Sequence, residues 1–185
     1  MKLLSFAVNG KSSWGAVDGE GVIDLGAACG GEAPTLASAL RRYALEEIEA
    51  MARTQPARIA LADVQYLPVI TDPVKIFCVG LNYEAHRVEA NRARTGTPTL
   101  FVRFQASQLG HGEPMLVPRE SDKFDYEGEI AIIIGKGGRR IPESKAWQHV
   151  AGYAPYNDGS IRDWQNHTTQ WTSGKNFPST GAFGP

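Results

Sequence analysis

The feature that most restricts the fold is an apolar strand whose first half carries acidic residues. Residues 124–135 read Phe-Asp-Tyr-Glu-Gly-Glu-Ile-Ala-Ile-Ile-Ile-Gly. Side chains alternate in direction along a strand, so Asp125, Glu127 and Glu129 are expected on one face. Side chains two apart lie roughly 7 Å from one another, and long carboxylates can therefore meet at one point. The strand fits either a solvent-facing polar side or a cation site, while its isoleucine run favours burial on both faces.

The first third of the chain predicts a small β-rich domain. Asn9-Gly10 and Asp18-Gly19 separate short apolar runs, as in tight hairpins. Thr35 is a plausible N-cap for one helix that continues to about Arg53. A proline-containing stretch, 66–73, then marks a boundary. We therefore expect an N-terminal accessory domain over 1–70 and a second domain over 71–185.

The second domain is predicted to be rich in strands. These strands are expected at 75–80, 100–104, 115–117, 124–135 and 150–155, followed by a helix over about 161–171. Residues 83–95 are polar and lack a continuous apolar stripe, so they fit a mobile lid or an exposed helix equally well.

Composition excludes several classes of partner. The 185 residues carry a formal net charge of -1, which gives no reason to expect a nucleic-acid partner. The arginines at 87, 92 and 94 alternate with glutamates and indicate a solvated segment. There is no apolar run as long as a membrane span, which takes roughly 20 residues. Only two cysteines are present, so we expect a reduced, soluble, cytoplasmic protein without a membrane partner.

A further carboxylate follows the last predicted strand. Asp158 lies in Asn-Asp-Gly, a common turn sequence, and Ser160 with Asp163 resembles a capping box for the next helix. A helix N-terminus beside Asp158 would favour its ionised form. Together with Glu127 and Glu129, and without His or Cys, it would suit Mg²⁺, or else Mn²⁺ or Ca²⁺.

Several ordered motifs carry a family resemblance. They are Lys-Ile-Phe-Cys-Val-Gly-Leu-Asn-Tyr-Glu-Ala-His at 75–86, Asp-Tyr-Glu-Gly-Glu at 125–129, Gly-Tyr at 152–153 with Asn-Asp-Gly-Ser-Ile-Arg-Asp at 157–163, and Gly-Lys-Asn-Phe at 174–177 before a final Gly-Pro. In this order the chain resembles the fumarylacetoacetate hydrolase family over most of residues 74–185.

The resemblance implies an α+β, β-rich fold, with a mixed β-sandwich or roll core, and a homodimer that acts on a small 2-oxo acid. It also implies a role for each matched residue. The metal ligands would be Glu127, Glu129 and Asp158; the catalytic residues His86, Glu89 and Lys175; and the substrate-binding residues Arg103, Arg162 and Gln165.

General chemistry supports these roles. His86 and Glu89 are three apart and would share a helix face, so that the carboxylate could orient a base active near neutral pH. Lys175 could stabilise an oxyanion, although a surface lysine in a glycine-flanked loop is the alternative. Arg103 stands where many members have lysine, which leaves the substrate's distal group open. Family members continue well beyond Gly184-Pro185, so the catalytic domain is expected to be incomplete.

The leading functional hypothesis is a Mg²⁺-dependent hydrolase that cleaves a carbon–carbon bond in an acylpyruvate-like β-diketo acid during aromatic-compound breakdown. An isomerase, tautomerase or decarboxylase of an unsaturated 2-oxo acid on the same metal site is the alternative. A non-catalytic binding domain on a decayed enzyme fold is the third hypothesis.

Overall fold

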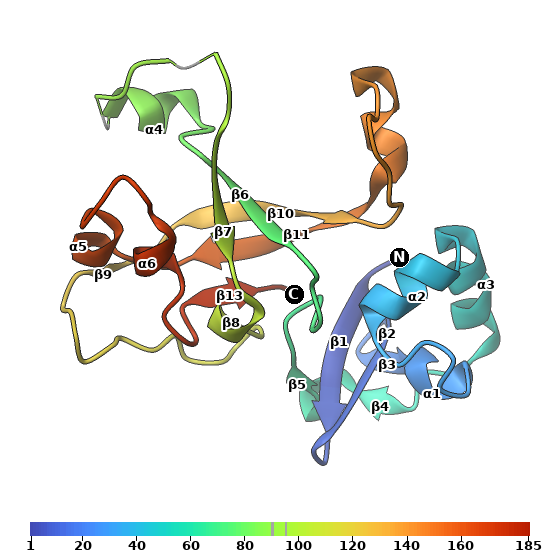
Figure 1. Ribbon diagram of the computed structural model, residues 1–185. Helices are drawn as coiled ribbons and strands as arrows, with labels where there is room; N and C mark the ends of the chain where they lie inside the picture. The colour runs from blue at the N-terminus through green and yellow to red at the C-terminus, as the bar shows by residue number, and fades with distance from the viewer. Residues whose placement is uncertain (90, 95) are drawn as a thin grey trace.

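A computed structural model describes residues 1–89, 91–94 and 96–185 of the chain. Its N-terminal part is an antiparallel sheet in the order β4-β3-β2-β1-β5 (Figure 1). The strands are β1 (Leu3–Val8), β2 (Lys11–Asp18), β3 (Gly21–Asp24), β4 (Ile59–Ala60) and β5 (Gln65–Tyr66). Asn9 and Gly10 both have positive φ, at 50° and 76°, which confirms the predicted hairpin turn.

Short helices cover one face of this sheet: α1 (Leu25–Ala28), α2 (Leu36–Arg42) and α3 (Leu45–Thr54). Thr35 caps α2 as predicted, since its side chain accepts from the Ser38 N–H. The expectation of one helix to Arg53 is wrong. The backbone is extended at Tyr43 and Ala44, and the Glu47 carboxylate accepts the Ala44 N–H at 2.7 Å and so begins a new helix.

The second part is built on a mixed sheet in the order β10-β11-β13-β8. Its strands are β10 (Gly128–Ile134), β11 (Val150–Asp158), β13 (Gly181–Phe183) and β8 (Gln108–Leu109), and only β13 and β8 run parallel. The expected single strand over 124–135 is interrupted. A separate strand, β9 (Phe124–Asp125), pairs with β12 (Ser160–Ile161), so the chain leaves one sheet before it enters the next.

An antiparallel pair, β6 (Ile76–Gly80) and β7 (Thr99–Arg103), crosses over this sheet, and α4 (Glu84–Glu89) lies between the two strands in sequence (Figure 1). The helix expected over 161–171 is instead two short ones, α5 (Arg162–Gln165) and α6 (Thr172–Lys175). The strand expected at 115–117 is absent from this described stretch. The remaining helices are 3₁₀ turns at Leu61–Asp63, Gln105–Ser107 and Glu143–His149.

One core connects the two parts. Trp14, Leu36 and Ile48 of the N-terminal part belong to the same buried cluster as Ala154 and Phe183 of the second sheet. The fold is therefore the expected mixed α+β, β-rich one. Among the described residues, no helix has the length and apolar character needed to cross a membrane.

The expectation that the isoleucine run is buried on both faces is wrong. Ile130, Ile132 and Ile134 are 66%, 54% and 61% exposed. The intervening Ala131 and Ile133 are partly buried and pack on the core cluster. β10 lies at the edge of its sheet, so one of its edges has no partner strand in the described part of the chain.

Candidate metal centre

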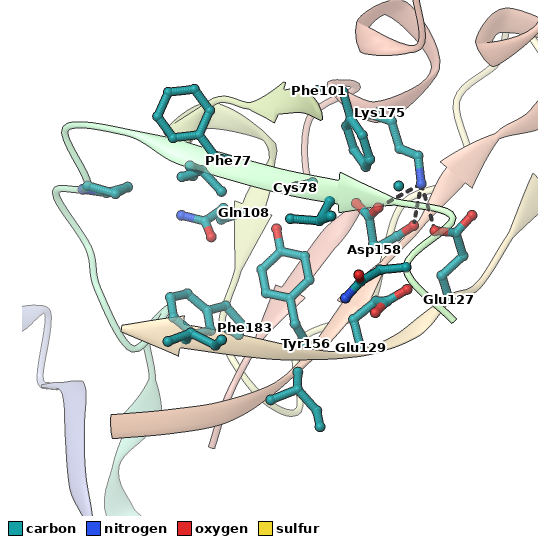
Figure 2. Close-up of a pocket in the computed structure, with 18 of the residues that line it drawn as sticks. Phe77, Cys78, Phe101, Gln108, Glu127, Glu129, Tyr156, Asp158, Lys175 and Phe183 are labelled. Carbon is teal, nitrogen blue, oxygen red and sulfur yellow. Dashed lines mark hydrogen bonds and ion pairs between the residues drawn. The ribbon is translucent and has the colours of Figure 1, made fainter. Parts of the chain in front are cut away.

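Two of the predicted ligands converge on a lysine (Figure 2). Asp158 ends β11, Glu127 immediately precedes β10, and the register of the two strands places them side by side, with the Asp158 N–H donating to the Glu127 carbonyl at 2.9 Å. Lys175, from α6, donates through Nζ to Asp158 Oδ2 at 2.6 Å and to Glu127 Oε2 at 2.7 Å. Its side chain is 1% exposed, so both ion pairs lie largely out of water.

Arg103 neutralises the other oxygen of Asp158. The Nη1 atom of this arginine, at the end of β7, donates to Asp158 Oδ1 at 2.5 Å and to the Gly159 carbonyl at 3.1 Å. Its other nitrogens donate to Ser107 and Thr180. With a side-chain exposure of 0%, Arg103 presents no surface to a substrate. The expected substrate contact is therefore not supported, and the geometry is that of a residue which positions Asp158.

Glu127 pairs with an arginine, Arg162, as well as with Lys175. Arg162, the first residue of α5, donates to Glu127 Oε1 at 2.5 Å and to Asp125 Oδ2 at 2.8 Å. Burial by itself raises the pKa of Glu127, but the nearby charges of Lys175 and Arg162 hold it below its ordinary value. Glu127 is therefore ionised at neutral pH. Asp125 and Glu127 were expected on one face of a strand, and in the structure both carboxylates accept hydrogen bonds from Arg162.

Glu129 has a different environment. It lies within β10, opposite Tyr156 of β11, and its carboxylate is hydrogen-bonded to the hydroxyl of Tyr83. Burial, followed by the charges of Glu127 and Asp158, raises the pKa of Glu129 above its ordinary value. Negative charge thus accumulates around Glu129, and a bound cation would offset this repulsion.

The expected dyad lies on one short helix near the same cleft. His86 and Glu89 belong to α4, where His86 Nδ1 is 4.0 Å from Glu89 Oε2. Both side chains are exposed. They contribute to the lining of a cleft of about 1030 Å³ that also contains the three carboxylates and Lys175. Within the predicted lid, 83–95, residues 90 and 95 lie outside the described residues.

Gln165 also lines this cleft. Its side-chain oxygen accepts from Arg162 at 2.9 Å, so two of the three predicted substrate-binding residues are in contact. The predicted capping box is wrong: Ile161 is the N-cap of α5, and the Ser160 hydroxyl instead contacts Glu127 and the Asp158 carbonyl. Asp158 is thus held by Lys175 and Arg103 rather than by a helix terminus.

The site contains residues that sequence reasoning missed. Figure 2 shows Tyr156 and Gln108 directed into the cleft beside Cys78. In the described portion of the chain, the buried Tyr156 hydroxyl and Gln108 Nε2 have no hydrogen-bond partner. Phe101 of β7 places its ring 5.0 Å from Lys175 Nζ. The signal for Tyr156 was available, because it precedes Asp158 by two residues and shares its side of β11.

The types of residue in the site suit a divalent cation, but their present arrangement does not form a complete binding site. Three oxygen ligands suit a hard ion such as Mg²⁺ or Mn²⁺, and two of them already converge on one positive charge. Over residues 1–89, 91–94 and 96–185, however, no group of three or more acidic, histidine or cysteine side chains is arranged to hold an ion as it stands. Lys175 takes up the oxygens that an ion would need.

Comparison with known proteins places this site in a family. The profile of the fumarylacetoacetate (FAA) hydrolase C-terminal family matches residues 75–185. The mitochondrial oxaloacetate tautomerase fahd2 of Xenopus laevis is 35% identical over 176 residues, which are 91% of this chain and 54% of that relative. The chain therefore spans about half the length of the curated relatives it matches.

Solved structures agree. The fumarylacetoacetate hydrolase of Exiguobacterium antarcticum has a TM-score of 0.82 and 29% identity, with 100% of this chain and 65% of that one covered. The maleylpyruvate hydrolase of Sphingobium sp. SYK-6, solved with manganese(II) and pyruvate, has a TM-score of 0.78 and 25% identity, with 100% and 66% covered. The family profile covers more than half of the chain and includes every residue of the site. This chain belongs to the fumarylacetoacetate hydrolase family.

Proposed function

We propose that the chain carries the active site of a divalent-metal-dependent enzyme that transfers a proton on a small 2-oxo acid, a keto–enol tautomerase. The observation that carries this proposal is the meeting of Glu127, Asp158 and Lys175 in the cleft, with Glu129 beside them. The sequence alone ranked carbon–carbon hydrolysis first. The similarity to oxaloacetate tautomerases puts proton transfer ahead of it.

Each group has a proposed role. Glu127, Glu129 and Asp158 would hold Mg²⁺ or Mn²⁺, which supplies Lewis acidity toward a 2-oxo acid when bound. Lys175 contributes a positive charge next to these carboxylates, where it favours negative charge developing on a substrate oxygen. Arg162, whose side chain is 32% exposed, would bind a substrate carboxylate, with Gln165 keeping its guanidinium in place. Arg103 acts through Asp158 and does not touch substrate.

Proton movement is assigned to α4. The imidazole of His86 would serve as the general base, and Glu89 on the same helix face can orient its ring. Tautomerisation needs this base and no attacking water. Hydrolysis would need both, with His86 activating the water.

The test is the rate of ketonisation of oxaloacetate enol, followed by its ultraviolet absorbance with Mg²⁺, with Mn²⁺ and with excess chelator. We expect a metal-dependent rate that falls by at least about 10²-fold in His86→Ala, the typical contribution of an acid–base group. A rate equal to that of buffer in every condition would refute the tautomerase assignment.

Hydrolysis is the second candidate, because the structurally similar maleylpyruvate hydrolase binds manganese and pyruvate. It is tested with a panel of acylpyruvates and mass analysis of the products. Two fragments that require added metal indicate hydrolysis, whereas a single product of unchanged mass indicates isomerisation and release of CO₂ indicates decarboxylation. A protein that binds Mn²⁺ and turns over none of these substrates would instead support the non-catalytic binding domain.

A further inference from the structure

We propose that Lys175 is an internal counterion of the metal site: it occupies the carboxylates when no ion is bound and must leave them for an ion to bind. This inference rests on the metal site proposed above. It adds a residue that sets the affinity for the ion, separate from any part Lys175 plays in the reaction.

The contacts of the ammonium group carry the inference. Lys175 Nζ lies 2.6 Å from Asp158 Oδ2, 2.7 Å from Glu127 Oε2 and 3.5 Å from the Asp158 carbonyl oxygen. Charge-assisted bonds of this length use the carboxylate lone pairs that a hard cation would also use. An ion held by these oxygens and the ammonium group therefore compete for one position.

The surrounding charges make the competition strong. Asp158 Oδ1 and Glu127 Oε1 are already occupied by Arg103 and Arg162, so on these two carboxylates the oxygens facing Lys175 are those left for an ion. Neither Lys175 nor Asp158 has more than slight contact with water, with side-chain exposures of 1% and 6%. A buried pair of this kind is costly to break unless the freed charge finds another partner.

The ammonium group has a neighbour besides the carboxylates. In its present position Lys175 Nζ already lies 5.0 Å from the centroid of the Phe101 ring, within the range of a cation–π contact that does not depend on the carboxylates. Lys175 comes from α6 and the carboxylates from β10 and β11, so a change of lysine rotamer can open the site while both strands stay in place.

The thermodynamic consequence is a lowered apparent affinity. If only a fraction of molecules has Lys175 displaced, the apparent dissociation constant is raised by the inverse of that fraction. Removal of the ammonium group should therefore tighten metal binding, although it destabilises the metal-free protein by leaving Glu127 and Asp158 short of positive charge.

The first experiment is calorimetric titration of Mn²⁺ into the wild type, Lys175→Met and Lys175→Arg, with Lys123→Met as matched control. Lys123 lies in the same domain, and its side chain is 62% exposed. We expect Lys175→Met to bind Mn²⁺ at least about tenfold tighter, with the control unchanged and Lys175→Arg no tighter than the wild type. Equal or weaker binding by Lys175→Met overturns the inference and leaves the metal site standing. Absence of binding in all four proteins would refute the metal site itself.

A second measurement uses the wild type, so that it stands even if Lys175→Met does not fold. In protein labelled with ¹⁵N-lysine, a buried ammonium group exchanges slowly enough to give its own signal, assigned by its loss in Lys175→Arg. We expect this signal in chelator-treated protein and a shift or disappearance at saturating Mg²⁺. An unchanged signal at a Mg²⁺ concentration that a matching calorimetric titration with Mg²⁺ shows to be saturating would overturn the inference.

Discussion

At the scale of single residues, Arg103 and Lys175 divide the negative charge of one buried carboxylate. Arg103 holds Asp158 Oδ1 at 2.5 Å and has no exposed surface. Removing one partner of a buried pair leaves an uncompensated charge. We expect Arg103→Leu to lower the free energy of unfolding of the metal-free protein by about 3–5 kcal/mol, as measured by urea denaturation in the presence of chelator.

The control is Arg53→Leu, because Arg53 pairs with Glu49 at a position where its side chain is 75% exposed. Exposed pairs contribute little, so this change should stay within about 1 kcal/mol. Similar urea midpoints for the two variants would contradict the positioning role of Arg103.

The thiol of Cys78, on β6, gives a prediction about its rate of alkylation. Burial raises the pKa of its thiol to about 12. The thiolate is the reactive form, so a raised pKa suppresses reaction at all pH values below it. In a Cys29→Ser background, where Cys78 is the sole thiol, we expect alkylation by iodoacetamide at pH 8 to be at least about 10²-fold slower in native than in urea-unfolded protein. Equal rates would show that the thiol is accessible and ionises normally.

The site residues that could be predicted are those for which the chemistry of the side chain and the position in an ordered motif indicate the same role. Glu127, Asp158 and Lys175 were named from the sequence, and the structure brings them together. Arg103 was named as a substrate contact, and its burial among Ser107, Asp158 and Thr180 joins segments far apart in the chain that no local pattern relates. Tyr83 was part of the motif at 75–86 but was given no role in the site, since its hydrogen bond to Glu129 joins elements far apart in the chain.

At the scale of elements, the short helices α5 and α6 place Arg162, Gln165 and Lys175, and they pack closely. A Cβ added at Gly174 would come within 2.4 Å of the Gln165 backbone nitrogen, so these helices can approach only with glycine there. We expect Gly174→Ala to lower the free energy of unfolding by about 1–3 kcal/mol. It should also alter Mn²⁺ affinity, because Lys175 is the next residue. Thermal unfolding and calorimetry measure the two effects.

Gly137→Ala is the matched control. Apart from its two neighbours in the chain, no residue comes within 4 Å of a Cβ built at Gly137, and its φ is not positive. The same substitution there should change neither quantity appreciably. Equal stabilities of the two variants would mean that α5 and α6 can move apart without cost.

Element types were easier to predict than their ends. The hairpin at Asn9-Gly10 and the cap at Thr35 were correct because local chemistry determines both. The break between β9 and β10 was missed, since the alternating pattern continues through Tyr126 and Glu127. It arises from tertiary pairing, as Asp125 pairs with Ser160 while Gly128 pairs with Asn157. The alternation of apolar and polar residues within one segment carries no information about which strand it pairs with.

At the scale of the whole molecule, two strand faces carry apolar side chains into solvent. On β6 and β7, Val79 lies opposite Leu100, and Phe77 lies on the same face. On β10, the exposed residues are Ile130, Ile132 and Ile134. Exposed apolar faces on an edge strand favour association. The homodimer expected from the sequence thus becomes a proposal that this surface can support.

We therefore expect the 185-residue chain to self-associate in a concentration-dependent way and to bind the dye ANS, as seen in sedimentation velocity and fluorescence. A charge placed on the buried side of such an interface is costly, so Ile132→Glu should shift the protein toward monomer and lower ANS binding. Val117→Glu is the matched control, since Val117 is also exposed but belongs to none of the strands. A monomer at every concentration, without ANS binding, would mean that these faces do not drive association. If Ile132→Glu and Val117→Glu behave alike, association uses another surface and β10 is not the contact.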